Sequence, residues 1–232
     1  MSVIVHPDLW KRFPGMKILC VTGKGLNNQG ENRKVEQLLA KAHDAVTPEQ
    51  LEHQNVQAWR EMYQIAGISM GKYPVSVLAM VKRIAKGGRV PSINPLVNFY
   101  NAISIANISP LGGMDLDQLT GHQELRFTQE GEDFLAIGAE SAEKVQPGEI
   151  CYSDERGITT RHFAWRQSLR GAIQPTTKNF VLFSEIVPGT VDGLLEKIQQ
   201  ELVDGLEKYF GVTASTEIIE EKILVPPAGI IS

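Results

Sequence analysis

The chain has 232 residues, of which 42% are hydrophobic and 22% are charged, and its formal net charge is −4. This length lies below the size at which a single hydrophobic core usually divides, and the composition is typical of a folded globular protein, so we expect one domain spanning residues 1–232. The acidic balance excludes strong nonspecific affinity for nucleic-acid phosphates, which comes from clustered lysine and arginine, and we expect no DNA partner.

The N-terminal residues and the two cysteines suggest where the protein works. Residues 1–8 lack the basic start and apolar run of a signal peptide, and no later run reaches the roughly 20 apolar residues of a membrane span. Cys20 and Cys151 lie in separate apolar stretches without a metal-binding pattern. We therefore expect a cytoplasmic protein with reduced, buried thiols and no membrane partner.

Residues 1–90 are predicted to contain a strand followed by mainly helical structure. Apolar and β-branched residues predict a buried strand over Met16–Thr22, and the glycine-rich stretch after it lacks the spacing of a phosphate loop. Thr47 and Gln50 have the pattern of a capping box, and His53, a few residues on, is interpreted as a surface or boundary residue. Apolar residues at helical spacing predict helices over 31–45, 47–67 and 74–86.

Residues 91–232 are predicted to form the sheet region that carries the pocket. An apolar helix over 96–104 places Asn98 and Asn101 one turn apart on one face, and amides on a buried helix face need partners. A last helix is predicted over Thr190–Phe210, with the threonine as its cap. The expected strands lie at 125–127, 134–137, 150–153, 158–165, 180–187 and 218–225.

The stretch Ser109–Asp115 is predicted to be a sharp turn. Gly112 and Gly113 stand in its middle. Because glycine has no Cβ, the backbone there can approach a ligand closely.

The segment Arg161–Ser168 sets arginines, a histidine, a tryptophan and a glutamine along a predicted strand. Alternation would place His162 and Arg166 on one face, and Trp165 and Gln167 on the other. One face would then line a pocket, where an arginine guanidinium suits a carboxylate or a phosphate. The alternative is an arginine and a tryptophan stacked at the edge of a sheet by cation–π attraction.

Seven short motifs follow one another along nearly the whole chain: Phe13-Pro14-Gly15, Ala58–Tyr63, Tyr73–Ser76, Lys82-Arg83, Ser92–Val97, Asn101–Ser104 and Trp165-Arg166-Gln167. Together they resemble the freestanding B3/B4-domain proteins, which are similar to the B3/B4 module of the bacterial phenylalanyl-tRNA synthetase β subunit. The resemblance implies an α+β fold with a mixed, barrel-like central sheet flanked by helices. It also implies a site related to the one with which that module hydrolyses tyrosine wrongly esterified to the phenylalanine tRNA.

Single positions of the module carry over to this sequence. Asn101 takes the place of the module's asparagine, and Pro110 and Asp115 keep the ends of the following turn. Gly112 stands where the module has a histidine that it uses in editing. The later editing-pocket glutamate corresponds to Glu185.

The resemblance implies a chemistry that needs no strong nucleophile, because an aminoacyl ester is already activated. The amides of Gly112 and Gly113 are assigned to the oxyanion, and Asn101 and Glu185 to the α-amino group or a water. His162 is a candidate to replace the missing imidazole, or else it is a packed strand residue. No metal or cofactor is required. The candidate substrate-binding residues are Asn98, Asp115, Trp165, Arg166 and Gln167.

We therefore expect a stand-alone aminoacyl-tRNA editing protein that hydrolyses the ester of a misacylated tRNA in trans. The alternative is a non-catalytic module that keeps the scaffold and binds a tRNA end or a free amino acid. A third possibility is an interaction subunit that assists a synthetase.

Overall fold

The computed structural model describes residues 3–221. The α-helices are α1 (Pro7–Arg12), α2 (Arg33–Asp44), α3 (Gln54–Ala66), α4 (Ser76–Ala85), α5 (Pro95–Asn107) and α6 (Leu194–Phe210), with 3₁₀ helices η1 (Pro48–Glu52) and η2 (Leu116–Gln118). The strands of the first half and middle are β1 (Val3–Val5), β2 (Lys17–Gly23), β3 (Gly112–Asp115), β4 (Gln123–Phe127), β5 (Asp133–Phe134) and β6 (Glu143–Lys144). The remaining strands are β7 (Ile150–Asp154), β8 (Gly157–Arg161), β9 (Arg166–Gln167), β10 (Phe180–Ile186) and β11 (Ser215–Glu220).

The strands are divided between two main sheets and a small hairpin. One sheet has the order β1-β4-β7-β8-β9, the other has the order β11-β2-β10-β3, and β5 pairs with β6. The first sheet is mixed, because β1 pairs with β4 in parallel while β4, β7, β8 and β9 pair antiparallel. The predicted α+β class with a mixed sheet flanked by helices is confirmed.

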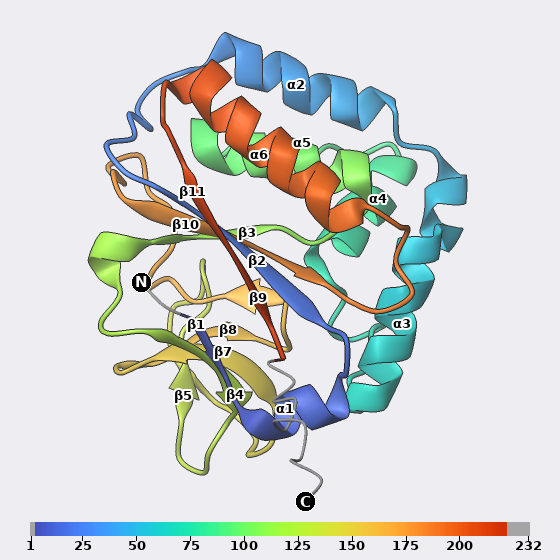
Figure 1. Ribbon diagram of the computed structural model, residues 1–232, viewed down its shortest axis with the longest axis vertical. Coiled ribbons are helices and arrows are strands. Elements are labelled where there is room, and N and C mark those ends of the chain that lie inside the picture. The colour runs from blue at the N-terminus through green and yellow to red at the C-terminus, as the bar shows by residue number, and fades with distance from the viewer. Residues whose placement is uncertain (1–2, 222–232) are drawn as a thin grey trace, which may run out of the picture.

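The sheets and helices form layers (Figure 1), in which α2, α5 and α6 lie on one side of the β2–β10 sheet and the β4–β7–β8 sheet lies on the other. Side chains of β2 alternate between the two interfaces, as the pleat of a strand requires. Ile18 and Cys20 belong to the core shared with the first sheet, whereas Leu19 and Val21 pack in the core shared with α5 and α6. The β2–β10 sheet is therefore covered on both faces.

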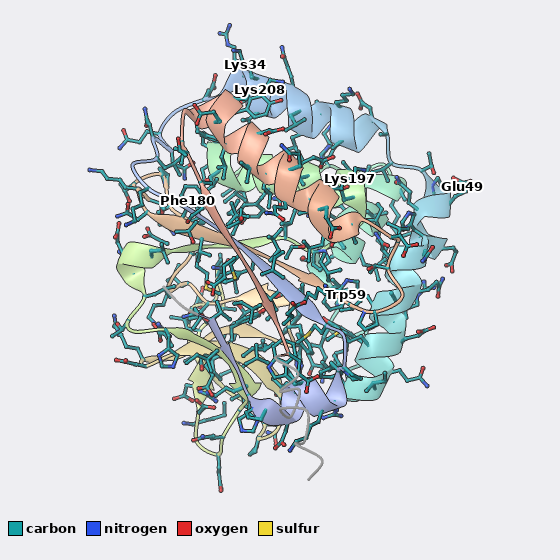
Figure 2. The ribbon with its side chains drawn as sticks, viewed as in Figure 1. Lys34, Glu49, Trp59, Phe180, Lys197 and Lys208 are labelled. Atoms are coloured by element: carbon teal, nitrogen blue, oxygen red, sulfur yellow. The ribbon has the colours of Figure 1, made fainter. Side chains whose placement is uncertain are left out.

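Side chains in Figure 2 follow this layering. Phe180 and Trp59 are directed inward and are 0% and 2% exposed, whereas Lys34 and Lys197 point away from the ribbon. Cys20 and Cys151 are buried free thiols, and burial raises the pKa of each to about 12. Among the described residues, no helix combines the length and the apolarity that crossing a bilayer would take.

The helices predicted at 31–45, 74–86 and 96–104 are confirmed as α2, α4 and α5. The continuous helix predicted from Thr47 to Gly67 is wrong, because the chain forms η1 and then restarts as α3. The predicted link from Gln50 Oε1 to the Thr47 N–H is present at 3.1 Å. His53, predicted to be a surface or boundary residue, is partly exposed and also caps α3 by accepting a hydrogen bond from the Asn55 N–H at 3.1 Å.

The last helix begins later than predicted. Gly193, in a left-handed conformation with φ of 73°, precedes the first residue of α6, and glycine adopts that conformation without a Cβ penalty. Thr190, predicted to be the cap, instead donates its hydroxyl to the Val187 carbonyl at 3.0 Å. The final strand, predicted at 218–225, is confirmed over Ile218–Glu220 within β11, and its positions from 222 onward lie outside the described residues.

Candidate functional site

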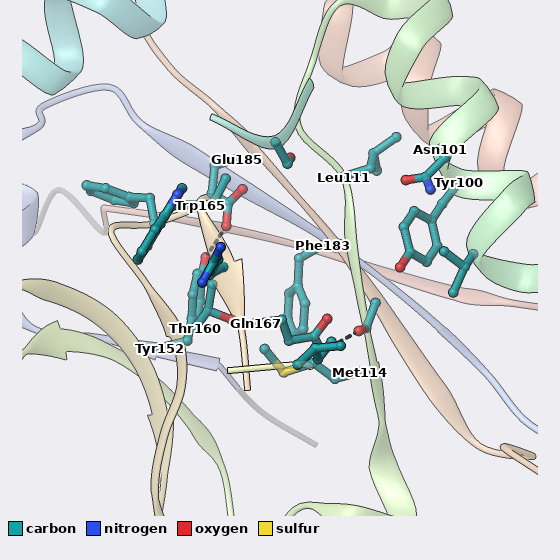
Figure 3. Close-up of a pocket in the computed structure, with 18 of the residues that line it drawn as sticks. Tyr100, Asn101, Leu111, Met114, Tyr152, Thr160, Trp165, Gln167, Phe183 and Glu185 are labelled. Carbon is teal, nitrogen blue, oxygen red and sulfur yellow. Dashed lines mark hydrogen bonds between the residues drawn. The ribbon is translucent and has the colours of Figure 1, made fainter. Parts of the chain in front are cut away.

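A cavity of about 360 Å³ lies where the two sheets and α5 meet. Its walls come from β3, β7, β8, β9, β10 and α5, elements that are far apart along the chain. Figure 3 shows side chains of these elements pointing toward a common space. The apolar part of the wall consists of Ile93, Val97, Leu111, Met114, Ile137, Phe163 and Phe183, together with the rings of Tyr100 and Tyr152. An apolar cavity with a few polar groups is typical of a small-ligand site.

The structure brings most of the predicted site residues to this one cavity. They come from the helix that carries the asparagine, from the double glycine and from the tryptophan–arginine–glutamine segment. The predicted residues that line the cavity are Asn101, Gly112, Gly113, Trp165, Arg166, Gln167 and Glu185. Asn98, Asp115 and His162 do not line it.

The segment Arg161–Ser168 is not a continuous strand, so the predicted alternation of its side chains is wrong. β8 ends at Arg161, and β9 begins only at Arg166. Between them lies the His162–Trp165 turn, in which His162 and Phe163 have φ of 47° and 57°. Non-glycine residues rarely adopt this left-handed region. Tertiary packing holds the turn, because the Phe163 ring is fully buried and edge-on to Phe13 and Trp59.

His162 lies behind the turn, away from the cavity. Its ring stacks on Tyr73 with centroids 3.9 Å apart, and its Nε2 is 3.3 Å from a Glu149 carboxylate oxygen. Its backbone carbonyl accepts a hydrogen bond from the Tyr63 hydroxyl at 2.8 Å. Burial lowers the His162 pKa to about 4, so the imidazole is neutral at neutral pH. The structure therefore gives His162 a packing position and does not bring it to the place of the missing imidazole.

The two arginines of this segment have different environments. Arg161 is buried and forms two hydrogen bonds to Glu149, each 2.8 Å long, and one to Glu143 at 2.7 Å. Arg166 is exposed at the cavity and has no ion pair among residues 3–221. Its guanidinium lies over the Trp165 ring, 5.0 Å from the centroid. The predicted arginine–tryptophan stack is therefore present, and it leaves the nitrogen atoms of Arg166 free for an anion.

Gly112 and Gly113 lie in strand β3 and not in the predicted turn. β3 is the edge strand of its sheet, and its Gly113 carbonyl accepts a hydrogen bond from Gln167 Nε2 at 2.8 Å. In an antiparallel strand the N–H and C=O of one residue point to the same edge and those of the next residue point to the opposite edge. The Gly113 N–H therefore points to the free edge and the Gly112 N–H points toward β10. The two amides cannot serve one oxyanion together.

The side chain of Gln167, predicted to bind substrate, makes hydrogen bonds within the protein. Its Nε2 donates both to the Gly113 carbonyl and, at 3.2 Å, to the Gly171 carbonyl. Both amide hydrogens are thus used within the protein, one to tie β9 to β3 and the other to hold the loop that follows β9. Only the Gln167 side-chain oxygen remains for a ligand.

The two asparagines predicted on one face of α5 also have separate roles. Asn98 accepts a hydrogen bond from the Ile93 N–H at 2.9 Å and donates to the Ser92 hydroxyl at 2.7 Å, which fixes the segment before the helix. Asn101 is 9% exposed, and its amide has no hydrogen bond to any other described residue. Asp115 is committed like Asn98, because it accepts from the Asp117 N–H and the Thr177 hydroxyl.

Glu185 is the buried acid of the cavity. It is 5% exposed and accepts a hydrogen bond from the Tyr152 hydroxyl at 2.7 Å, drawn as a dashed line in Figure 3. Burial raises the pKa of Glu185, and the hydrogen bond from Tyr152 offsets part of that rise. Its charge in turn helps to raise the pKa values of Tyr152, Tyr63 and Cys20. No cation forms an ion pair with Glu185 among residues 3–221.

The cavity also contains polar residues that the sequence did not indicate. Tyr100, Tyr152, Thr160 and Ser76 all line it. Tyr152 had one local signal, since a tyrosine in an apolar strand needs a partner for its hydroxyl. That partner is 33 positions away in the sequence, so no local pattern could identify it.

The architecture and the cavity define an α+β protein with a mainly apolar pocket that contains a buried carboxyl group. The model of the B3/4 domain family matches residues 58–200, which is more than half of the chain, and the protein belongs to this family. The matched region runs from α3 into α6 and contains every residue that lines the cavity.

The comparison with solved structures found a crystal structure of an N-terminal fragment of the phenylalanyl-tRNA synthetase beta-subunit from Pyrococcus horikoshii. The similarity has a TM-score of 0.49 at 10% sequence identity, and it covers 95% of this chain and 54% of that one. The protein thus spans about half the length of that fragment. The search of curated proteins found no match.

Proposed function

We propose that the protein is a tRNA-associated domain whose cavity binds the aminoacylated 3′ end of a tRNA and hydrolyses the ester of a misacylated tRNA in trans. Membership of the B3/4 family and the motif resemblance to the synthetase module support the association with tRNA. One observation supports the site: a free amide, a free guanidinium and a buried carboxyl group, on three separate elements, face one mainly apolar cavity.

The proposed hydrolysis uses a water held by the cavity's polar groups. The water oxygen attacks the ester carbonyl carbon, the carbon–oxygen bond to the ribose breaks, and the ribose oxygen takes up a proton that the attacking water releases, so that the free amino acid and the ribose hydroxyl are the products. Asn101 and Glu185 hold the water or the α-amino group, and the single Gly113 N–H faces the developing oxyanion. Arg166 binds a phosphate or ribose oxygen at the exposed end. Positioning in a site that excludes bulk water is the main source of rate for an ester that is already activated.

A second candidate is binding without catalysis, of a tRNA end or a free amino acid. Specific observations favour it. His162 does not reach the cavity, only one glycine amide faces the free edge, and both amide hydrogens of Gln167 are used within the protein. These features leave fewer groups for transition-state stabilisation than the resemblance implies.

Deacylation and binding assays separate the two candidates. The purified protein is incubated with a panel of misacylated tRNAs, and ester loss is followed beside the spontaneous rate. We expect Asn101→Ala, Arg166→Ala and Glu185→Ala each to lower the rate at least about 10-fold, whereas Arg156→Ala, an exposed arginine away from the cavity, leaves it unchanged. Binding without deacylation would favour the second candidate, and absence of both would overturn the proposal.

A further inference from the structure

Glu185 is a buried carboxyl group without a counter-ion. Its hydrogen-bond donor is the hydroxyl of Tyr152, which is itself only 2% exposed. The titratable groups around it are Tyr152 on β7, Tyr63 on α3 and Cys20 on β2. All of them have raised pKa values, so all are neutral at neutral pH. A carboxylate in this setting needs either a proton or a cation from outside.

The acidic and basic groups of the cavity differ in their exposure to solvent. Glu185 is almost fully buried, whereas Arg166 is exposed and carries the positive charge. The rest of the cavity wall is mainly apolar, and electrostatic interactions beside such a low-dielectric wall are stronger than in bulk water. A ligand with a protonated amine beside Glu185 would supply the missing counter-ion. A ligand with a neutral group there would leave the carboxyl group to be protonated.

We propose that Glu185 and Tyr152 form a subsite for the ligand's ammonium group, in which Tyr152 is a positioning residue that holds the Glu185 carboxylate in place. This inference rests on the proposed function, in which the ligand is an aminoacyl group, and it states which part of that group is recognised. Tyr152 occupies one lone pair of Oε1 at 2.7 Å and leaves the rest of the carboxylate for the amine. The amine must then be free and not acylated.

Equilibrium binding of small probes tests this without any turnover. The probes are phenylalaninamide, tyrosinamide, leucinamide and methioninamide, each with its N-acetyl counterpart, measured by calorimetry at pH 7. We expect the wild-type protein to bind at least one free amine about 10-fold or more tightly than its acetylated form, because a buried charge pair is lost. Glu185→Gln, which keeps the shape and an acceptor for Tyr152, should abolish that preference.

The pH profile tests the role of Tyr152. Loss of a hydrogen bond to the carboxylate raises the Glu185 pKa further, so in Tyr152→Phe the acid limb of amine binding should move upward by about 1 pH unit. The alkaline limb, set by the amine near pH ~8, should stay in place. Tyr100→Phe is the matched control, because Tyr100 also lines the cavity but its hydroxyl makes no hydrogen bond with the described residues, and no shift is expected.

Three results would overturn the inference. One is equal affinity for free and acetylated probes, and another is no binding of any amine at millimolar concentration. The third is an acid limb that Tyr152→Phe does not move although the variant is folded. Tighter binding of tyrosinamide than phenylalaninamide, with no effect of acetylation, would assign Glu185 to a side-chain hydroxyl instead. Failure of deacylation with amine binding intact would refute only the proposed hydrolysis.

Discussion

Gly112 and Gly113 are neighbours in the sequence but face different surroundings. A Cβ on Gly112 would meet no atom within 4 Å, because that side of the strand faces the cavity. A Cβ on Gly113 would lie 3.0 Å from both Leu182 and Tyr100 and 3.2 Å from Ile173. Only the second glycine is therefore required by packing. The first leaves room for a ligand.

This difference predicts that the same substitution destabilises the protein at one glycine and leaves its stability nearly unchanged at the other. Gly113→Ala should lower the free energy of unfolding by about 1–3 kcal/mol, since the extra methyl group overpacks the interface with α5. Gly112→Ala should change it by no more than about 0.5 kcal/mol. Urea unfolding of both variants beside the wild type measures the difference. Equal losses in the two variants would contradict the assignment of the two strand faces.

At the scale of elements, the His162–Trp165 turn decides which side chains reach the cavity. It points Trp165 and Arg166 into the site and keeps His162 behind, against Tyr73 and Glu149. The imidazole stays neutral because burial opposes its protonation, although the neighbouring carboxylate acts the other way. The neutral form is thus part of the folded state of the turn.

This burial predicts a pH dependence of stability. The His162 pKa is about 4 in the folded protein and 6.5 in the unfolded chain, so the unfolded state takes up the proton first as the pH falls. The contribution of neutral His162 to the free energy of unfolding is fully present above pH ~6.5. As the pH falls to ~4, this contribution is lost, which lowers the free energy of unfolding by up to about 3 kcal/mol. His162→Asn, which tolerates the left-handed backbone, should lack this component. The prediction is contradicted if the free energy of unfolding depends on pH in the same way for the wild type and the variant between pH 4 and 7.

The contrast between helices and this turn explains how much the sequence could predict. α2, α4 and α5 were predictable because apolar residues recur at helical spacing within each segment. The turn was not, because histidine and phenylalanine have no local preference for its left-handed backbone. Its stability comes from partners such as Phe13 and Trp59, about 100 residues or more away in the sequence.

The candidate site shows the same contrast between what the sequence could predict and what it could not. Asn101 and Arg166 could be selected by residue type and Glu185 only through the family resemblance, and the structure brings all three to one cavity. Whether such a residue is free could not be predicted, because the partners of Asn98 and Gln167 depend on the three-dimensional structure. Sequence therefore predicts the chemistry of a site better than it predicts which groups remain available.

At the scale of the molecule, the main core joins distant parts of the chain. It contains Leu9 of α1, Trp59 of α3, Leu125 of β4 and Phe183 of β10. The central sheet likewise pairs β2 from the N-terminal part with β10 and β11 from the C-terminal part. The subregion at 1–90 thus shares its core and its sheet with the rest. We propose on this basis that residues 1–232 fold as one unit.

A single cooperative unfolding transition is the expected consequence, because the N-terminal subregion cannot separate from the rest without exposing the shared core. The three tryptophans, Trp10, Trp59 and Trp165, lie in α1, α3 and the 162–165 turn. Variants that keep one tryptophan each, with phenylalanine at the other two positions, report on these regions separately. Within each variant, the fluorescence transition should coincide with the far-ultraviolet circular dichroism transition, and the calorimetric and van't Hoff enthalpies should agree. A Trp59 signal that changes before the circular dichroism of the sheets would show that the helical subregion unfolds independently, which is the result that two domains would produce.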